Sequence, residues 1–161
     1  MKKFIIIIFS VFLIFAACAE NSVSVPKLSI PLKVTAKLSG SEACFTAIIR
    51  EAQCEITFEH KHSLTGTILN FDENGGKATV GDFTREIEFS SFPAQNALVK
   101  ALRGIYQSPH SGVKTDNATK YTIDEMTIMV YYNEDTEEII GITTEEGGRR
   151  YEFTVVALES I

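Results

Sequence analysis

The sequence has no tryptophan and only three histidines, three cysteines and four prolines among its 161 residues. So few cysteines cannot make a disulfide-dense scaffold, and one domain of this length can bury a sizeable core without such links. Basic residues are also scarce, 15 against 21 acidic ones, which argues against a nucleic-acid partner and against electrostatic docking on an anionic membrane. After the first stretch, no apolar run reaches the roughly 20 residues of a membrane-spanning helix.

The first 17 residues are typical of a cleaved signal peptide. A positive start (MKK) precedes an apolar run over residues 4–15, broken only by Ser10, which is too short to cross a bilayer. The letters FAAC at its end resemble the motif that lipoprotein signal peptidase recognises. We therefore expect residues 1–17 to be removed, and Cys18 to carry a lipid that anchors the protein to a membrane of the bacterial cell envelope.

Two alternatives to the lipid anchor remain open. The letters ACA also form an ordinary cleavage site that would release the chain before Glu20, and an uncleaved anchor is the third possibility. Removal of residues 1–17 leaves 13 basic and 21 acidic residues, a net charge of −8. Residues 18–31 carry scattered serines and prolines without helical periodicity, which predicts a tether between the anchor and a single β-rich domain over residues 32–161.

Apolar and polar residues alternate from Leu32 onward, which indicates half-buried strands. The segments between them are of hairpin length, and this favours an antiparallel meander over parallel strands, which need long crossovers. We expect a mainly β fold that curves into an open half-barrel. About ten strands are predicted, at residues 32–38, 43–50, 53–60, 65–71, 77–80, 83–89, 119–123, 126–132, 138–143 and 149–157.

One segment changes to helical periodicity. Apolar residues recur at helical spacing between Pro93 and Tyr106, and Pro93 suits a first helical turn. Ser91 is the nearest residue that could cap the helix. We expect this amphipathic helix to pack on the concave face of the sheet, with Leu98 and Leu102 in its apolar stripe.

The register of two strands bears on the cysteines. A two-residue loop at Glu51 and Ala52 sorts the apolar residues onto one face, and it places Cys44 and Cys54 on opposite faces, roughly 16 Å apart along the ladder. A disulfide needs Cα atoms within about 7 Å, so we expect two free thiols.

The inward face of the predicted sheet is rich in aromatic residues. Arg85 shares that face, and a buried guanidinium is costly unless it is paired. Two interpretations of Arg85 stay open, a cavity that holds a polar group or a bulge that turns the side chain outward. The face as a whole is either an ordinary core covered by the helix or an apolar pocket. The candidate ligand-binding residues are Phe45, Phe58, Phe83, Arg85, Phe89, Leu98, Leu102, Tyr151 and Phe153.

Other polar motifs do not add up to a reactive site. His60 and His62 share one face of a strand but lack a third ligand, and the acidic residues 134–138 do not have the spacing of a calcium-binding loop. No nucleophile with a paired base is evident. The sequence predicts a protein with no metal, no cofactor and no catalytic residue.

The order of elements resembles the LolA/LolB-type lipoprotein carriers. A lipoprotein signal precedes a long meander that is broken once by the helix 93–106, and the stretch VYYNEDTEEIIGI over residues 130–142 is similar to the strand–turn–strand near the end of such proteins. The resemblance implies an open half-barrel that binds acyl chains or another apolar ligand. We therefore expect a lipid-anchored, non-catalytic protein that binds a lipid or lipoprotein acyl chain. The alternative is an anchored protein with a filled core that acts through protein contacts.

Overall fold

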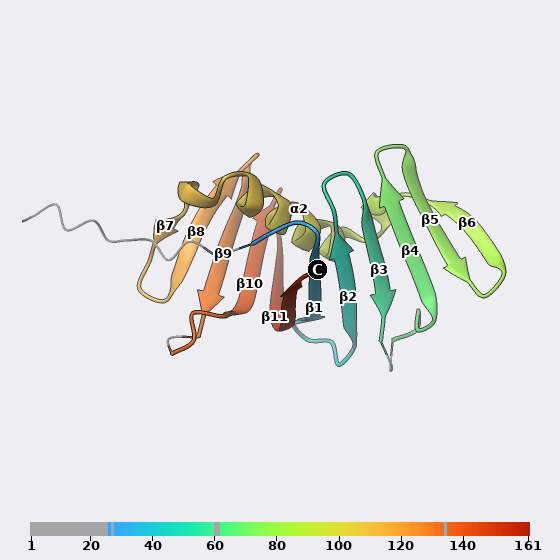
Figure 1. Cartoon of the computed structure of the whole chain (residues 1–161), viewed down its shortest axis with the longest axis horizontal. Coiled ribbons are helices and arrows are strands. Elements are labelled where there is room, and N and C mark those ends of the chain that lie inside the picture. The colour runs from blue at the N-terminus through green and yellow to red at the C-terminus, as the bar shows by residue number, and fades with distance from the viewer. Residues whose placement is uncertain (1–25, 27, 60–61, 134) are drawn as a thin grey trace, which may run out of the picture.

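A computed structural model describes residues 26, 28–59, 62–133 and 135–161. In this part of the chain, eleven antiparallel strands form one open sheet and a single α-helix packs against it (Figure 1). The predicted mainly β fold with one helix is confirmed. The strands are β1 (Leu32–Leu38), β2 (Cys44–Ile49), β3 (Cys54–Phe58), β4 (Thr67–Asp72), β5 (Gly75–Val80), β6 (Phe83–Ile87), β7 (Val113–Lys114), β8 (Ala118–Ile123), β9 (Met126–Tyr132), β10 (Ile139–Glu146) and β11 (Arg149–Ser160).

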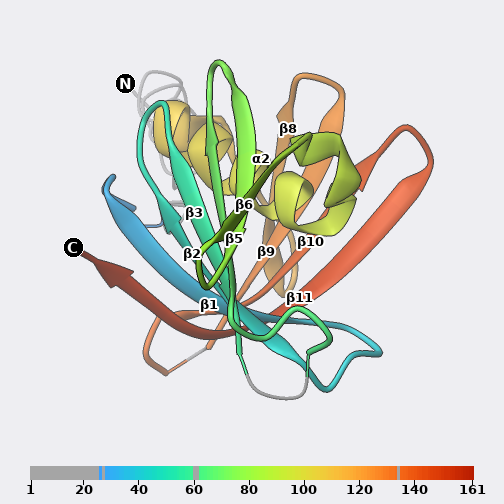
Figure 2. The ribbon, with the colours of Figure 1, turned by 90° about the vertical axis from the view of Figure 1, so that its right-hand side faces the viewer.

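The sheet joins two meanders through the first and last strands of the chain. The strand order is β6-β5-β4-β3-β2-β1-β11-β10-β9-β8-β7, so β1 and β11 lie side by side in the middle. Strands β6 and β7 form the two edges, although they are consecutive in the chain. The helix α2 (Pro93–Gln107) connects them, and its 15 residues span about 22 Å. Figure 2 shows that α2 lies in the trough of the curved sheet.

Alternation places one side of each central strand against the helix. Val34, Ala47, Ile56 and Ile128 come from four strands and are all fully buried. The buried stripe of α2, which includes Leu98, Leu102 and Ile105, packs on this face. Leu28 and Ile30, from the segment predicted as a tether, also pack against the core.

Three local expectations need correction. The two-residue strand β7 was not predicted, because two residues show no period. Strand β6 ends at Ile87, and Phe89 lies in the 3₁₀ turn η1 (Phe89–Ser91) instead of continuing the strand. The N-cap of α2 is Phe92 and not Ser91, and no side chain caps the helix.

The predicted register of β2 and β3 is confirmed. Ile49 pairs with Cys54 across the two-residue loop, and the Arg50 amide donates to the Gln53 carbonyl over 2.8 Å. Cys54 therefore faces the core and Cys44 faces the other side, and both are free thiols. Burial of Cys54 raises the pKa of its thiol to about 12, so this thiol stays protonated at physiological pH.

Candidate functional site

The space beneath α2 is filled by side chains. Five of the predicted ligand-binding residues lie there, each 5% exposed or less: Phe45, Phe58, Leu98, Leu102 and Phe153. The Phe45 ring packs edge-on against Phe153 with centroids 6.3 Å apart, and Phe58 lies 6.3 Å from Phe92 at the start of the helix. The geometry of this face is that of an interior, in which aromatic rings interdigitate with the helix.

Two further predicted residues lie at the border of this core. Phe89 in η1 is half-buried and stacks on Phe71 of β4 with centroids 4.1 Å apart. Gly76 of β5 lies beneath this stack, and a Cβ atom there would collide with the Phe71 ring and lie 2.9 Å from the Ile87 carbonyl. Tyr151 of β11 is half-buried and also packs against the core. The core thus ends near β5.

Phe83 and Arg85 lie outside the core although they face the helix side of the sheet. Phe83 pairs with Val80, and Arg85 with Ala78, so these side chains continue the face that is buried further along the sheet. The helix does not reach them, and Phe83 is 84% exposed. The expectation that Phe83 points into an enclosed interior is therefore wrong. The bulge interpretation of Arg85 is wrong, because the ladder between β5 and β6 is regular. The cavity interpretation stays a prediction, since Arg85 is exposed at the edge of the sheet and is one of the residues that line a hollow of about 930 Å³.

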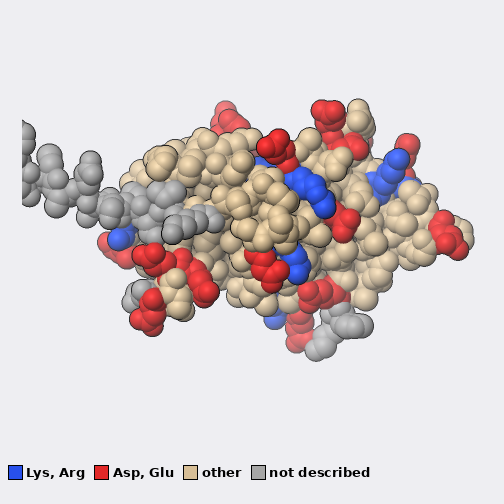
Figure 3. All heavy atoms as spheres, in the orientation of Figure 1, with Lys and Arg blue, Asp and Glu red and all other residues tan. Residues whose placement is uncertain are grey.

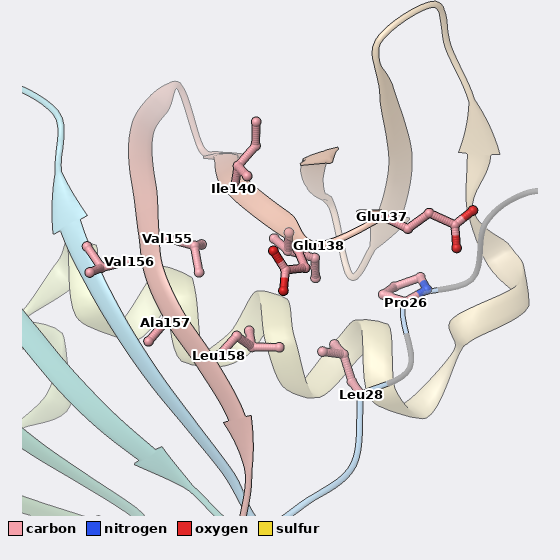
Figure 4. A pocket seen from close by; sticks show the side chains of 10 residues that line it. Pro26, Leu28, Glu137, Glu138, Ile140, Val155, Val156, Ala157 and Leu158 are labelled. Atoms are coloured by element: carbon pink, nitrogen blue, oxygen red, sulfur yellow. The ribbon is translucent and has the colours of Figure 1, made fainter. Parts of the chain in front are cut away.

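A hollow opens where β10 and β11 separate (Figure 4). The ladder between these strands ends at the pair Gly141 and Thr154, while β11 continues alone beside β1 as far as Ser160. The gap leaves a cavity of about 340 Å³. It is lined by Pro26, Leu28, Glu137, Glu138, Ile139, Ile140, Val155, Val156, Ala157 and Leu158.

Irregularities on both strands create this hollow. The register of β11 against β1 shifts between Val155 and Ala157, so that Val156 has no partner, and the register of β10 against β9 shifts at Ile140. In Figure 4, Leu28 and Leu158 approach each other across the hollow and Val155 points into it, whereas Val156 points to the other side of β11. The hollow is thus walled by aliphatic side chains from segments far apart in the chain.

Carboxylates mark the rim of the hollow. Glu137 and Glu138 belong to the turn before β10, and Glu137 has a positive φ of 57°. A second hollow of about 510 Å³ adjoins the first, because Glu137 and Ile140 line both. Its other walls come from the ends of β8 and β9 and include Ala118, Tyr131 and Tyr132 beside Asn117 and Asn133, and the larger part of its lining surface is apolar. The acidic rim disfavours a ligand with an anionic group at this point.

A small group of hydroxyls interrupts the apolar core below β8 and β9. Tyr121 is fully buried beside Tyr132, which in turn neighbours Thr119, yet the two phenol hydroxyls have no hydrogen-bond partner of good geometry. Burial, together with the neighbouring Tyr132, raises the pKa of Tyr121, and burial also raises the pKa of Tyr132. Both phenols therefore remain neutral and offer donors but no charge.

A metal-binding group of side chains is not found in the described part of the chain. Within it, no three His, Cys, Asp or Glu side chains come close enough together to hold a metal ion. His62, one of the weighed metal candidates, instead stacks on Phe58 with centroids 4.4 Å apart. His60, the signal peptide and the predicted lipid site Cys18 lie outside the described residues.

Comparison of the chain with protein-family models and with curated proteins finds no match. The resemblance to lipoprotein carriers therefore stays a prediction that rests on the order of elements. Among the described residues, no helix has the length and apolar character needed to cross a bilayer.

Sequence reasoning missed the hollow between β10 and β11, although one signal was available. Strict alternation in the last strand breaks at Val155 and Val156, two successive apolar residues. Such a break is typical of a β-bulge, which bends a strand away from its neighbour. The loss of pairing to β10 could not be predicted, because it depends on where Leu28 and the turn at Glu138 pack.

Proposed function

We propose that this protein is a non-catalytic binding protein of the bacterial cell envelope, held at a membrane by a lipid on Cys18, and that it binds a hydrophobic ligand. The observation that carries the proposal is the hollow between β10 and β11, most of whose lining residues are aliphatic although polar groups share its surface. Its volume of about 340 Å³ lies within the range of small-molecule sites. Beneath α2, where the sequence placed most of the ligand-binding residues, the described side chains form a packed core.

The position of the hollow suits a ligand that comes from a membrane. Pro26 and Leu28 line it, and Cys18 precedes Pro26 by eight residues. Eight extended residues reach at most about 28 Å, so a lipid on Cys18 would hold the hollow close to the bilayer surface. A ligand could then pass from the membrane into the protein over a short distance.

The charge of the protein narrows the ligand class. Glu137 and Glu138 stand at the rim, and on the face in Figure 3 the few basic side chains are interspersed with acidic ones. Anionic phospholipid headgroups are therefore unfavourable neighbours. We propose an acyl chain without an anionic group beside it, as in a neutral lipid or the acylated end of a lipoprotein.

The anchor is tested by radiolabelled palmitate. The wild-type protein should incorporate the label in its bacterial host, and the Cys18→Ala variant should not, because the thiol is the acceptor. Label that persists in the variant would contradict the lipid anchor.

The ligand site is tested with N-phenyl-1-naphthylamine, an uncharged dye that fluoresces in apolar surroundings. Leu158→Asn places a polar group in the hollow and should weaken dye binding at least about fivefold, since an unpaired amide in an apolar site costs about 1–3 kcal/mol. Leu38→Asn is the matched control, because Leu38 is also a half-buried leucine against the core, in the strand that pairs with β11.

The control variant Leu38→Asn should lower the stability of the protein but leave its affinity for the dye unchanged. If both variants weaken dye binding equally, or if the wild type does not bind the dye, the hollow is not the proposed site. Native mass spectrometry of the protein from its own host would then identify whether any lipid is carried elsewhere.

A further inference from the structure

The outer edge of β6 is the longest free strand edge at the ends of the sheet. Strand β6 spans five residues and pairs only with β5, whereas the opposite edge strand β7 has two residues. Figure 1 shows β6 at one end of the sheet, and four of its five residues are exposed, from Phe83 to Glu86. A hollow of about 930 Å³ lies over β4, β5 and the end of β6, so it is separate from the free edge although Arg85 and Glu86 are among the residues that line it.

The turn before β6 determines which backbone groups face outward. Gly81 has a φ of +56° and Asp82 a negative φ, so the two-residue loop between Val80 and Phe83 is of the type II′ class. Residues that flank such a loop form a hydrogen-bonded pair, and the bonding direction alternates along the strand. Phe83 therefore bonds to β5, and the N–H and C=O groups of Thr84 and Glu86 face the open edge.

A second copy of the chain is a poor partner for this edge. Two identical β6 strands can pair antiparallel in three symmetric registers, in which the central residue of one strand lies opposite the same residue of the other. Each of these registers places like charges opposite one another. Pairing centred on Thr84 opposes Asp82 to Glu86, pairing centred on Arg85 opposes two arginines, and pairing centred on Glu86 opposes two glutamates. Like charges directly opposite destabilise a strand pair. The sequence of β6 thus disfavours edge-to-edge association of identical chains.

We propose that β6 is a strand-addition site for an extended segment of a different protein. The added strand runs antiparallel to β6 and bonds to the outward groups of Thr84 and Glu86. On the helix side of the sheet it places an acidic residue opposite Arg85 and an apolar residue opposite Phe83. On the other side it places a basic residue opposite Glu86.

Exposure and charge on β6 match this kind of partner. The Phe83 ring is 84% exposed and its neighbour Val80 is 51% exposed, so an apolar residue opposite Phe83 would cover surface that this domain leaves open. Within the described residues, Arg85 makes no ion pair. An opposing carboxylate would supply the guanidinium with its counter-charge. This site is independent of the hydrophobic-ligand proposal.

Two synthetic peptides of identical composition test the proposal. The matched probe, Val-Lys-Glu-Thr-Val with a fluorescent label, sets its glutamate opposite Arg85 and its lysine opposite Glu86. The exchanged probe, Val-Glu-Lys-Thr-Val, opposes like charges at both positions. Fluorescence anisotropy should show at least about tenfold tighter binding of the matched probe, since two attractive cross-strand pairs become repulsive.

Variants of the protein make the test specific. The double substitution Arg85→Glu with Glu86→Arg should reverse the preference between the probes, and Lys120→Glu, an exposed charge change on β8, should leave it unchanged. Thr84→Pro removes an outward N–H and should abolish binding, while the backbone bonds to β5 stay and only the hydroxyl contact with Thr79 is lost. Equal binding of the two probes, no binding of either, or undiminished binding by Thr84→Pro would overturn the proposal.

Discussion

The two ends of the same sheet face differ in what covers them. Leu69 of β4 and Phe83 of β6 lie on one side of the sheet, two strands apart, yet Leu69 is fully buried and Phe83 is 84% exposed. The alternation pattern is the same in both strands. Alternation therefore determines which face a side chain takes, while the path of the helix determines whether that face is an interior.

The topology explains why the helix leaves one end uncovered. The chain finishes one meander at the edge β6 and begins the other at the opposite edge β7, so α2 must return across the middle of the sheet. The turn η1 and Phe92 lead the chain inward immediately after Ile87. The half of the β5–β6 hairpin beyond that point, with Val80 and Phe83, therefore remains without a cover.

The largest loss of stability is expected in the part of the sheet that the helix α2 covers completely. Leu98→Ala should lower the free energy of unfolding by about 2–5 kcal/mol, because it leaves a cavity between the helix and the strands. Urea denaturation measures the loss. Lys100→Ala, on the exposed side of the same helix, is the control and should change stability by less than about 1 kcal/mol, since its ion pair with Glu146 is exposed. A loss below about 1 kcal/mol for Leu98→Ala would show that the concave face is not packed.

An intermediate effect is expected at the border between the covered and uncovered parts. Gly76→Ala should cost about 1–3 kcal/mol, because the new methyl group collides with the Phe71 ring and displaces its stack with Phe89. Gly141→Ala on β10 is the control, because its nearest neighbours would lie at 3.4 Å or more. Equal thermal stability of the two variants would contradict the close packing at this border.

The reactivities of the two cysteines test whether the inner and outer faces of the β2–β3 hairpin differ in accessibility. A thiol reagent at pH 8 should modify Cys44 in the folded protein and should reach Cys54 only after unfolding, and the Cys44→Ala and Cys54→Ala variants assign each signal. The pKa of the Cys54 thiol rises from its ordinary 9.0 to about 12 on folding. Its contribution to stability is therefore complete below pH 9 and is lost as the pH rises toward 12. Rapid modification of Cys54 in the folded state would place it outside the core.

The smallest change in stability is expected at the β6 end of the sheet, which the helix does not cover. Phe83→Ala should change the free energy of unfolding by less than about 0.5 kcal/mol, as is usual for exposed positions away from caps and strained turns. The same substitution at Phe45 in the covered region should cost about 3–5 kcal/mol. A large loss for Phe83→Ala would mean that this ring is covered within the protein itself.

Sequence patterns predicted the secondary structure and the face of the sheet on which most side chains lie. The alternation in β2 and β3 was strong enough to give their register, and it correctly separated Cys44 from Cys54. The helical spacing from Pro93 onward gave the helix to within one residue of its end. These features depend on local periodicity, which the sequence displays directly.

Features that depend on distant segments were not predictable in the same way. The pairing of β1 with β11 carries no local signature, and without it the position of the edges is unknown. Phe83 and Arg85 looked like interior residues because their alternation is that of a covered strand. The hollow between β10 and β11 arises from the packing of Leu28 near Leu158, two residues 130 positions apart in the sequence.

Native-state amide hydrogen exchange tests the contrast between the covered and uncovered parts of the sheet most directly. We predict that amides of β1, β9 and α2 exchange only through global unfolding. The outward amides of Thr84 and Glu86 should exchange fastest among strand amides, and those of Phe83 and Arg85 more slowly. Protection of Thr84 and Glu86 as strong as that of β9 would contradict the free edge. Exchange of the α2 amides as fast as that of Thr84 would contradict the packed core beneath the helix.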